Sequence, residues 1–323
     1  MCEYLALAKN IRLKAFGVMM KKYSSLQIKN FICDYQENIS GNSLSSAILP
    51  KISIITPSYN QAEYLERTIL SVINQNYSNL EYIIIDGGSS DESIDIIKKY
   101  EKHISYWVSE MDNGQTDAIN KGFRIANGEI IAWQNSDDVY LPNALNTIAS
   151  AFITNPNVDL VFGNRYNIDK FDNILRDMRY VPFNYNALIY EGSALCNQTA
   201  FWRTSVFKKV GYLNEDMNFC MDYDFWVRTA KCATFLFVRE YIGCFRYHKK
   251  SKTSNLISLW QSEHLEILKR EGIIPNRVKQ ATSLLRRFIL LILQGDIGYI
   301  VRGILSRING DGLMLGEKWF YDK

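Results

Sequence analysis

The sequence is poor in the residues that build metal clusters and disulfide scaffolds. It contains only three histidines and six cysteines in 323 residues. The cysteines are scattered, with no C-x-x-C pair and none of the spacings that zinc sites use. This distribution argues against a disulfide-stapled fold or a structural zinc module, and it favours a reducing, cytoplasmic setting.

An excess of charge of one sign is also missing. Lys plus Arg number 37 and Asp plus Glu number 34, which leaves a surplus of three positive charges. That surplus is too small to suggest a nucleic-acid partner, so any anionic ligand must be met by a local basic cluster. With 47% apolar and 22% charged residues, the chain can bury one large hydrophobic core or two modest ones.

Long apolar runs are absent as well. No segment approaches the ~18 apolar residues of a membrane-spanning helix, and "MCEYLALAKNIRLKAF" lacks the basic head and unbroken apolar middle of a signal peptide. The longest apolar run lies in residues 284–308, where arginines interrupt and flank it. This segment predicts a helix pair, and two roles stay open. It could lie on anionic lipid at the inner face of the cytoplasmic membrane, or pack on the protein itself or on a second subunit.

Short β-rich segments alternate with helical segments from Lys51 onward. The alternation predicts a mainly parallel central sheet flanked by helices, with right-handed crossovers. Residues 1–49 end in "QENISGNSLSS", whose composition is typical of a linker. Residues 256–323 are expected to form a C-terminal helical extension.

The pattern is less regular after about residue 163. It predicts strand-like pieces near 161–181 and 194–203, a helix over about 222–231 and a strand pair over 233–247. We therefore expect a first half, 50–140, and a second half, 141–255, of one domain.

Four polar loops follow strand-like segments in the first half. They are "TPSYN", "DGGSSD", "MDNGQTD" and "NSDD". Ligands bind beyond the carboxyl ends of parallel strands, where such loops converge. The sequence therefore predicts one site built from all four loops.

The last of these loops contains two adjacent carboxylates, Asp137 and Asp138. Neighbouring carboxylates repel each other and are costly to bury unless a cation lies beside them. Hard oxygen ligands favour Mg²⁺ or Mn²⁺, often held by one or two carboxylates together with substrate phosphates. A bland alternative is that the pair caps a helix starting near Pro142 or lies in a solvated turn. The position behind an apolar strand, in line with the other loops, favours the metal.

In "DGGSSD", Asp86 ends a strand, so its carboxylate is expected to accept hydrogen bonds from a base or ribose. Gly87 and Gly88 allow the backbone to turn sharply and approach a ligand. The following "SSDES" is a helix start in any protein, and we assign no function to it.

Taken together, these motifs and "MDYDFWVR" resemble family 2 glycosyltransferases, over roughly residues 51–255. The run "GQTDAINKG" followed by "NSDD" is similar to the subgroup that builds bacterial surface polysaccharides such as O-antigens. The resemblance implies a GT-A fold and inverting transfer of a sugar, with a divalent metal, Mn²⁺ or Mg²⁺, as cofactor. The donor would be a nucleotide diphosphosugar, with UDP as the favoured nucleotide because UDP donors are common in the family.

The resemblance also implies roles for individual residues. Positions matching the family's nucleotide- and donor-binding residues are Thr56, Pro57, Ser58, Tyr59, Asp86, Asp117, Lys121 and Asp137. Within the family's DXD element, Asp138 matches the carboxylate that binds the metal, and Asp137 the one near ribose or sugar. Ser136 stands where other members have Asp.

Inverting transfer needs a base that takes the proton of the acceptor hydroxyl. "MDYDFWVR" aligns with the family's "EDYDLWLR"-like form and places Asp222 at the catalytic position, with Met221 in place of the usual Glu. Asp224 is the second carboxylate on the acceptor side. A structural role for Asp222, as the N-cap of the helix that follows, is compatible with catalysis.

Three further residues complete the predicted site. His248, in "CFRYHKKSKTS", is a candidate contact for the metal or the phosphates, and Lys249, Lys250 and Lys252 beside it could form an electropositive lip for the diphosphate. Gln198 matches a position that lines the acceptor or donor pocket. Trp202 could stack on a sugar, although a buried core role is the commoner one for a single Trp.

We expect a metal-dependent, inverting glycosyltransferase that acts on a growing, lipid-linked bacterial glycan. A nucleotidyltransferase should carry a Gly- and Arg/Lys-rich loop after its first strand, and "TPSYNQ" has neither. A catalytically silent glycan- or nucleotide-binding protein with the same fold is the remaining alternative, since fold alone does not establish activity.

Overall fold

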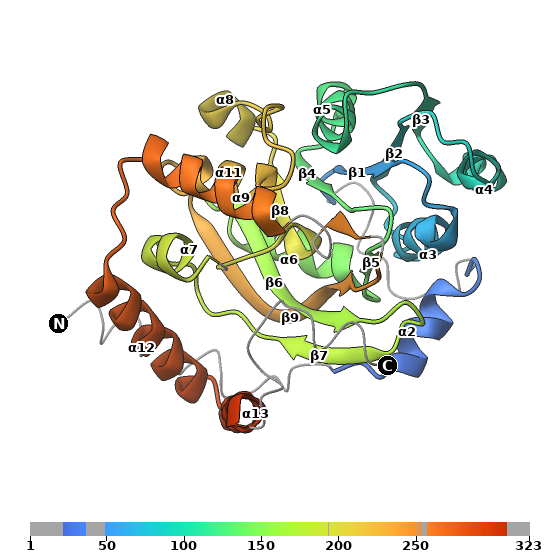
Figure 1. The fold of residues 1–323 in the computed structure, drawn as a ribbon. Helices are drawn as coiled ribbons and strands as arrows, with labels where there is room; N and C mark the ends of the chain where they lie inside the picture. The colour runs from blue at the N-terminus through green and yellow to red at the C-terminus, as the bar shows by residue number, and fades with distance from the viewer. Residues whose placement is uncertain (1–21, 37–48, 193, 250, 253–256, 309–323) are drawn as a thin grey trace.

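The computed structural model describes residues 22–36, 49–192, 194–249, 251–252 and 257–308. Its centre is one nine-stranded mixed sheet with helices packed around it (Figure 1). The strands are β1 (Ile52–Ser58), β2 (Leu80–Asp86), β3 (Tyr106–Ser109), β4 (Ile130–Trp133), β5 (Val139–Tyr140), β6 (Leu160–Ile168), β7 (Ile174–Met178), β8 (Ala200–Arg203) and β9 (Phe235–Arg246).

The sheet has a parallel half and a mixed half. Its order is β3-β2-β1-β4-β8-β6-β9-β5, with β7 paired to β6. Strands β3, β2, β1 and β4 are parallel, as predicted. Beyond β4 the sheet departs from the mainly parallel prediction, because β8 runs antiparallel to both β4 and β6. The parallel half is the part that aligns the carboxyl ends of its strands, and therefore the loops after them.

The predicted strand pair over 233–247 is wrong, because these residues form the single twelve-residue strand β9. The register of β9 against β6 instead shifts on both sides of Asn164, and the Asn164 Nδ2 donates to the backbone oxygen of Arg239 at 2.5 Å. A bulge bends the strand where a turn was expected.

Helices cover the sheet and connect its strands. They are α2 (Ser25–Ile32), α3 (Ala62–Ile73), α4 (Ser93–Lys99), η1 (Glu101–His103), α5 (Gln115–Ile125), α6 (Ala144–Thr154), α7 (Tyr185–Glu191), η2 (Asn197–Thr199), α8 (Val206–Val210), α9 (Met221–Thr229), α11 (Ile257–Arg270), α12 (Arg277–Leu293) and α13 (Ile297–Ile308). Helix α5 packs on β1 and β2. Its approach is close, because a Cβ added to Gly122 would lie 2.5 Å from the Cγ2 of Ile55.

Aromatic side chains form the centre of the core. The rings of Trp133 and Trp226 are stacked at 5.8 Å, and Trp202 meets both edge-on at 5.5 Å. Trp202 is fully buried. The expectation that it stacks on a sugar is therefore wrong, since the ring is enclosed by other aromatic rings.

The N-terminal helix α2 contributes to a second, smaller core. Its Ile28, Phe31 and Ile32 are buried in a cluster that also contains residues of β5, β6 and β9. Most of the predicted extension and its linker, at residues 1–21 and 37–48, lie outside the described residues, as does the predicted boundary at 255.

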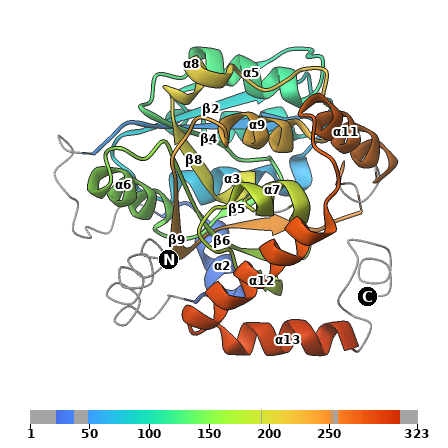
Figure 2. The same cartoon turned by 90° about the vertical axis from the view of Figure 1, so that its left-hand side faces the viewer.

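Helices α12 and α13 form the pair expected within 284–308. Helix α12 packs against α7 and α13, and both views place the pair at the periphery of the described chain (Figures 1 and 2). No helix in the described ranges is both long enough and apolar enough to cross a membrane.

Candidate active site

A pocket of about 640 Å³ lies at the carboxyl ends of the parallel strands. Each of the four loops predicted to converge contributes to its wall, so that prediction is confirmed. The loop residues that line it are Pro57, Ser58, Tyr59, Gly87, Met111, Asp112, Gly114, Gln115, Asn135, Ser136 and Asp137.

The rest of the wall comes from the second half of the domain. It includes Asn197, Gln198, Asn218, Phe219, Met221, Asp222, Phe245, Ser251 and Lys252. Gln198 and Asp222 are where the sequence predicted them, at the pocket. Lys252, from the predicted basic lip, also lines it, whereas Lys250 lies outside the described residues.

The "DGGSSD" loop reaches the pocket through its glycine backbone. Gly88 has a φ of +80°, and a Cβ added to Gly87 would lie 2.5 Å from the Asp112 carboxylate, so the expected sharp turn and close approach are present. Asp86 is fully buried and is not part of the pocket wall. Its carboxylate accepts hydrogen bonds from the backbone N–H of Ser89 at 2.8 Å and from the Ser109 hydroxyl at 2.7 Å. In this geometry Asp86 holds the loop together instead of facing a base.

Three other predicted donor-binding residues also lie outside the pocket wall. The Thr56 hydroxyl is buried 3.1 Å from that of Tyr82. Asp117 accepts from the backbone N–H of Asn113 at 3.0 Å, and Lys121 lies 3.1 Å from the Glu110 carboxylate. These contacts shape the loops beside the pocket.

Asp137 is the carboxylate of the adjacent pair that faces the pocket. Its Oδ2 lies 2.9 Å from the Nε2 of His248, and the His248 ring packs on Tyr64 with 4.5 Å between centroids. The sequence named both residues as site residues. The structure brings them together from segments 111 residues apart.

Asp138 has a different environment. It is fully buried and absent from the pocket wall. Its carboxylate accepts from Gln198 Nε2 at 2.8 Å, from Asn135 Nδ2 at 3.0 Å and from the backbone N–H of Arg246 at 2.8 Å. Burial, reinforced by the charge of Asp137, raises the pKa of Asp138 to about 7. Three protein donors hold the Asp138 carboxylate behind the pocket wall, and its role as the metal ligand stays a prediction.

The helix-capping part of the alternative for this pair is wrong, whereas the turn is present. Helix α6 begins at Ala144 with Asn143 as N-cap, and no side chain caps it. The turn is instead held by Arg246, whose Nε donates to the backbone oxygen of Asp137 at 2.6 Å and whose Nη1 pairs with Asp172 at 2.5 Å. Sequence reasoning missed Arg246, which lies two residues before His248.

Asp222 lies in the first turn of α9, after the N-cap Cys220, and lines the pocket. Its Oδ1 accepts from the backbone N–H of Tyr223 at 2.7 Å. Burial raises the pKa of the Asp222 carboxyl, and that backbone bond and the cations Arg165 and Lys252 oppose the shift. A raised pKa makes the Asp222 carboxylate a stronger base than an ordinary aspartate.

Asp224 does not belong to the acceptor pocket, contrary to the expectation. It is fully buried and pairs with Arg228 at 2.8 Å and with Arg270 at 2.5 Å. One helical turn brings Arg228 to it, and Arg270 comes from the end of α11. Asp224 therefore ties α9 to α11 beneath the site.

A polar chain that sequence reasoning did not find links several parts of the wall. Lys252 Nζ donates to Gln115 Oε1 at 3.0 Å and to the Asn218 backbone oxygen at 2.7 Å. Gln115 Nε2 in turn donates to Asn135 Oδ1 at 3.0 Å. The motifs "GQTD" and "NSDD" contained these amides, but no local pattern showed that they meet.

Comparison with known proteins identifies the family. Residues 53–227 match the model of Glycosyl transferase family 2, and the chain belongs to this family of glycosyltransferases. An uncharacterized glycosyltransferase of Rickettsia prowazekii is 28% identical over 281 residues, covering 83% of this chain and 87% of the relative. One of Rickettsia typhi is 28% identical over 244 residues, covering 73% and 76%.

Solved structures support the GT-A fold. Staphylococcus aureus TarS residues 1–349 in complex with UDP-GlcNAc match with a TM-score of 0.53 and 20% identity, over 68% of this chain and 66% of that one. A longer TarS structure matches over only 40% of its length. The Pyrobaculum calidifontis mannosyltransferase PcManGT, in complex with GDP-Man and Mn²⁺, matches with a TM-score of 0.52 and 17% identity, over 96% and 88%. At these identities the likeness concerns the fold.

Proposed function

We propose that the protein is an inverting, metal-dependent glycosyltransferase. It moves a sugar from a nucleotide diphosphosugar, a UDP-sugar, to a hydroxyl of a growing, lipid-linked bacterial surface glycan. The observation that carries the proposal is that one pocket is lined by both Asp137, paired with His248, and Asp222. In this proposal residues 50–255 form the catalytic domain, with 50–140 binding the nucleotide and 141–255 binding the acceptor.

The side chains of Asp137 and His248 fit as ligands of a divalent metal. They offer one carboxylate oxygen and one imidazole nitrogen 2.9 Å apart at the pocket wall. Among the described residues, no group of three or more His, Cys, Asp or Glu side chains could hold a metal. Two protein ligands match sites in which diphosphate oxygens and water supply the others, and an imidazole favours Mn²⁺ over Mg²⁺. The bound metal would neutralise charge on the departing diphosphate.

Asp222 acts as the base in this proposal. It takes the proton of the acceptor hydroxyl while that oxygen bonds to the anomeric carbon, and the bond from that carbon to the donor phosphate breaks. The nucleoside diphosphate leaves with the bonding electrons. The pocket backbone at Pro57 to Tyr59 and at Gly87 would hold the nucleotide, and Gln198 would orient the sugar or acceptor.

A panel of nucleotide sugars, including UDP-GlcNAc and GDP-mannose, tests the proposal through release of nucleoside diphosphate. The assays use the full chain with lipid-linked acceptor glycans, with and without Mn²⁺, and the anomeric configuration of the product is read by NMR. Turnover that is lost in Asp222→Asn and on chelation, with inverted configuration, is expected. Full activity of Asp222→Asn, or nucleotide binding without turnover of any donor, would overturn it, and the second result would favour the catalytically silent alternative.

A further inference from the structure

Exposed apolar side chains gather on the two C-terminal helices. Of the 25 large apolar side chains that are exposed in the described part of the chain, 11 lie on α12 and α13. We call them the α12–α13 face: Val278, Leu284, Leu285, Phe288, Ile289, Ile292, Leu293, Ile297, Val301, Ile304 and Leu305. So dense an apolar surface on a protein usually marks an interaction site.

The spacing of these residues separates the face from the core. Val278, Leu285, Ile289 and Ile292 follow one another at steps of seven, four and three, which places them on one side of α12. Leu290 and Leu291 point the other way and are buried against Val181. Packing on the protein itself therefore accounts for the inner side of α12 and leaves the outer side without a partner among the described residues.

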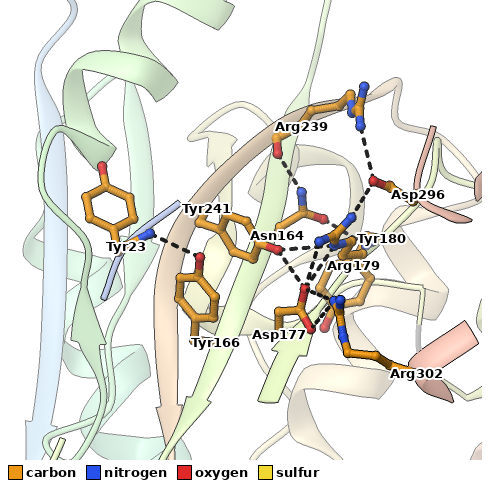
Figure 3. Close-up of polar contacts among 10 residues, drawn as sticks. All are labelled: Tyr23, Asn164, Tyr166, Asp177, Arg179, Tyr180, Arg239, Tyr241, Asp296 and Arg302. Carbon is orange, nitrogen blue, oxygen red and sulfur yellow. Dashed lines mark hydrogen bonds and ion pairs between the residues drawn. The ribbon is translucent and has the colours of Figure 1, made fainter. Parts of the chain in front are cut away.

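The helix pair is fixed to the domain, so the face has a defined orientation. Arg179 lies between two carboxylates, Asp177 of β7 and Asp296 at the start of α13 (Figure 3). Arg302 of α13 pairs with the same Asp177 at 3.1 Å, and Arg239 of β9 lies 3.3 Å from Asp296. Loss of one member of such a buried network strongly destabilises a protein. The network therefore holds α12 and α13 in a fixed position on the domain.

The charges around the face indicate what covers it. Arg277, Lys279 and Arg302 are exposed, with Lys279 beside the Tyr190 ring and Arg302 beside Asp177. Residues 277–305 contain a single acidic residue, Asp296. Asp296 is buried and paired with Arg179. A basic, apolar surface is complementary to anionic lipid headgroups and the acyl boundary beneath them. In a symmetric dimer through this face, the same basic residues would gather in one interface.

We propose that the α12–α13 face binds a membrane surface that contains anionic lipid, with both helices lying in the headgroup region. The lipid-linked acceptor of the proposed function would be found at that surface. The membrane contact itself rests only on the face, its charges and its anchoring. It is therefore tested by binding, without donor or acceptor.

Vesicle flotation of the full chain provides the test. Vesicles of phosphatidylcholine alone are compared with vesicles that also contain phosphatidylglycerol. The wild type is expected to float with the anionic vesicles and far less with the neutral ones. Leu285→Glu combined with Ile289→Glu should reduce binding about tenfold or more, because two charges replace apolar groups in the exposed α12–α13 face that would contact the lipid. The matched control is Leu265→Glu, an equally exposed leucine on α11 (54%) outside the face, which should bind as the wild type does.

A second variant tests the electrostatic part. Arg277→Gln combined with Lys279→Gln should remove most of the preference for anionic over neutral vesicles while keeping the apolar contact. Thermal unfolding and binding of nucleoside diphosphate, measured on every variant, show whether the pocket is intact. If the proposed function is wrong and the membrane proposal is right, the wild type will float with the anionic vesicles and will not bind nucleoside diphosphate.

Three outcomes would overturn the membrane proposal. In the first, the wild type floats with neither vesicle. In the second, the double Glu variant floats as well as the wild type. In the third, light scattering shows that the wild type is a dimer and that the double Glu variant is a monomer. The last would assign the face to a second copy of the chain.

Discussion

The Nε2 of His248 lies 2.9 Å from the Oδ2 of Asp137, and this contact joins the end of β9 to the loop after β4. It separates the two adjacent carboxylates by role. Asp137 faces the pocket with the imidazole nitrogen of His248 beside it. Asp138 instead accepts hydrogen bonds from Gln198, Asn135 and Arg246.

The first prediction concerns this difference. Asp137→Asn should lower kcat/KM at least about 100-fold, or ~3 kcal/mol of transition-state stabilisation, and weaken the Mn²⁺ dependence of nucleotide binding in calorimetry. Its thermal stability should stay close to that of the wild type, because the side chain is at the pocket wall.

Asp138→Ala is the informative partner for that experiment. It leaves three donors without their acceptor, and two of them, Gln198 and Arg246, are buried, so it should unfold at a distinctly lower temperature. If Asp138→Ala were stable and had lost only its metal response, the assignment of the metal to Asp137 would be wrong.

The second prediction concerns the base. Asp222→Asn should reduce kcat by about 10²- to 10⁴-fold and leave the affinity for nucleotide diphosphate nearly unchanged, as measured by calorimetry. A large loss of nucleotide affinity with an unchanged kcat would place Asp222 on the donor side instead.

The third prediction concerns pH. Burial raises the pKa of Asp222, and the positive charge of Arg165 opposes that shift. A base must be ionised, so kcat/KM should fall as the pH drops through this pKa. Removing the charge with Arg165→Gln raises the pKa further and should move the acidic limb to higher pH. Arg165→Lys, which keeps the charge, should largely restore the wild-type limb; an unmoved limb in Arg165→Gln would contradict the coupling.

The fourth prediction concerns Asp224, which the sequence placed in the acceptor pocket. Asp224→Ala leaves Arg228 and Arg270 without their buried partner and should cost about 3 kcal/mol of unfolding free energy, measured by urea denaturation. This is the low end for a buried pair, because both arginines are partly exposed. The KM for acceptor in the remaining folded enzyme should change little. A stable Asp224→Ala with a raised acceptor KM would restore the pocket assignment.

Local patterns were enough to predict the parallel half of the fold and the convergence of its loops. Strands such as β1 and β2 are rich in isoleucine, and the polar residues after them lie at one edge because parallel strands end there. Sequence also named Asp137, Asp222, Gln198 and His248, which the structure places at or beside one pocket.

Contacts between distant segments could not be predicted in the same way. Asp86 and Asp138 stand in motifs, and their spacing does not reveal whether a carboxylate faces a ligand or a neighbouring backbone N–H. The bulge of β9 depends on Asn164, on another strand, and the pairing of Asp224 depends on Arg270, 46 residues further on. These roles are set by tertiary packing, which no local pattern encodes.

Gly122 shows how far from the pocket its dimensions are set. A single methyl group there would collide with Ile55 at 2.5 Å, so even Ala would push α5 away from β1, at about 1–3 kcal/mol. The other end of α5 carries Gln115, whose Nε2 donates to Asn135 Oδ1 at 3.0 Å, and both residues line the pocket. The distance between α5 and the sheet, which Gly122 keeps short, therefore sets the position of Gln115 in the pocket wall and with it the width of the pocket.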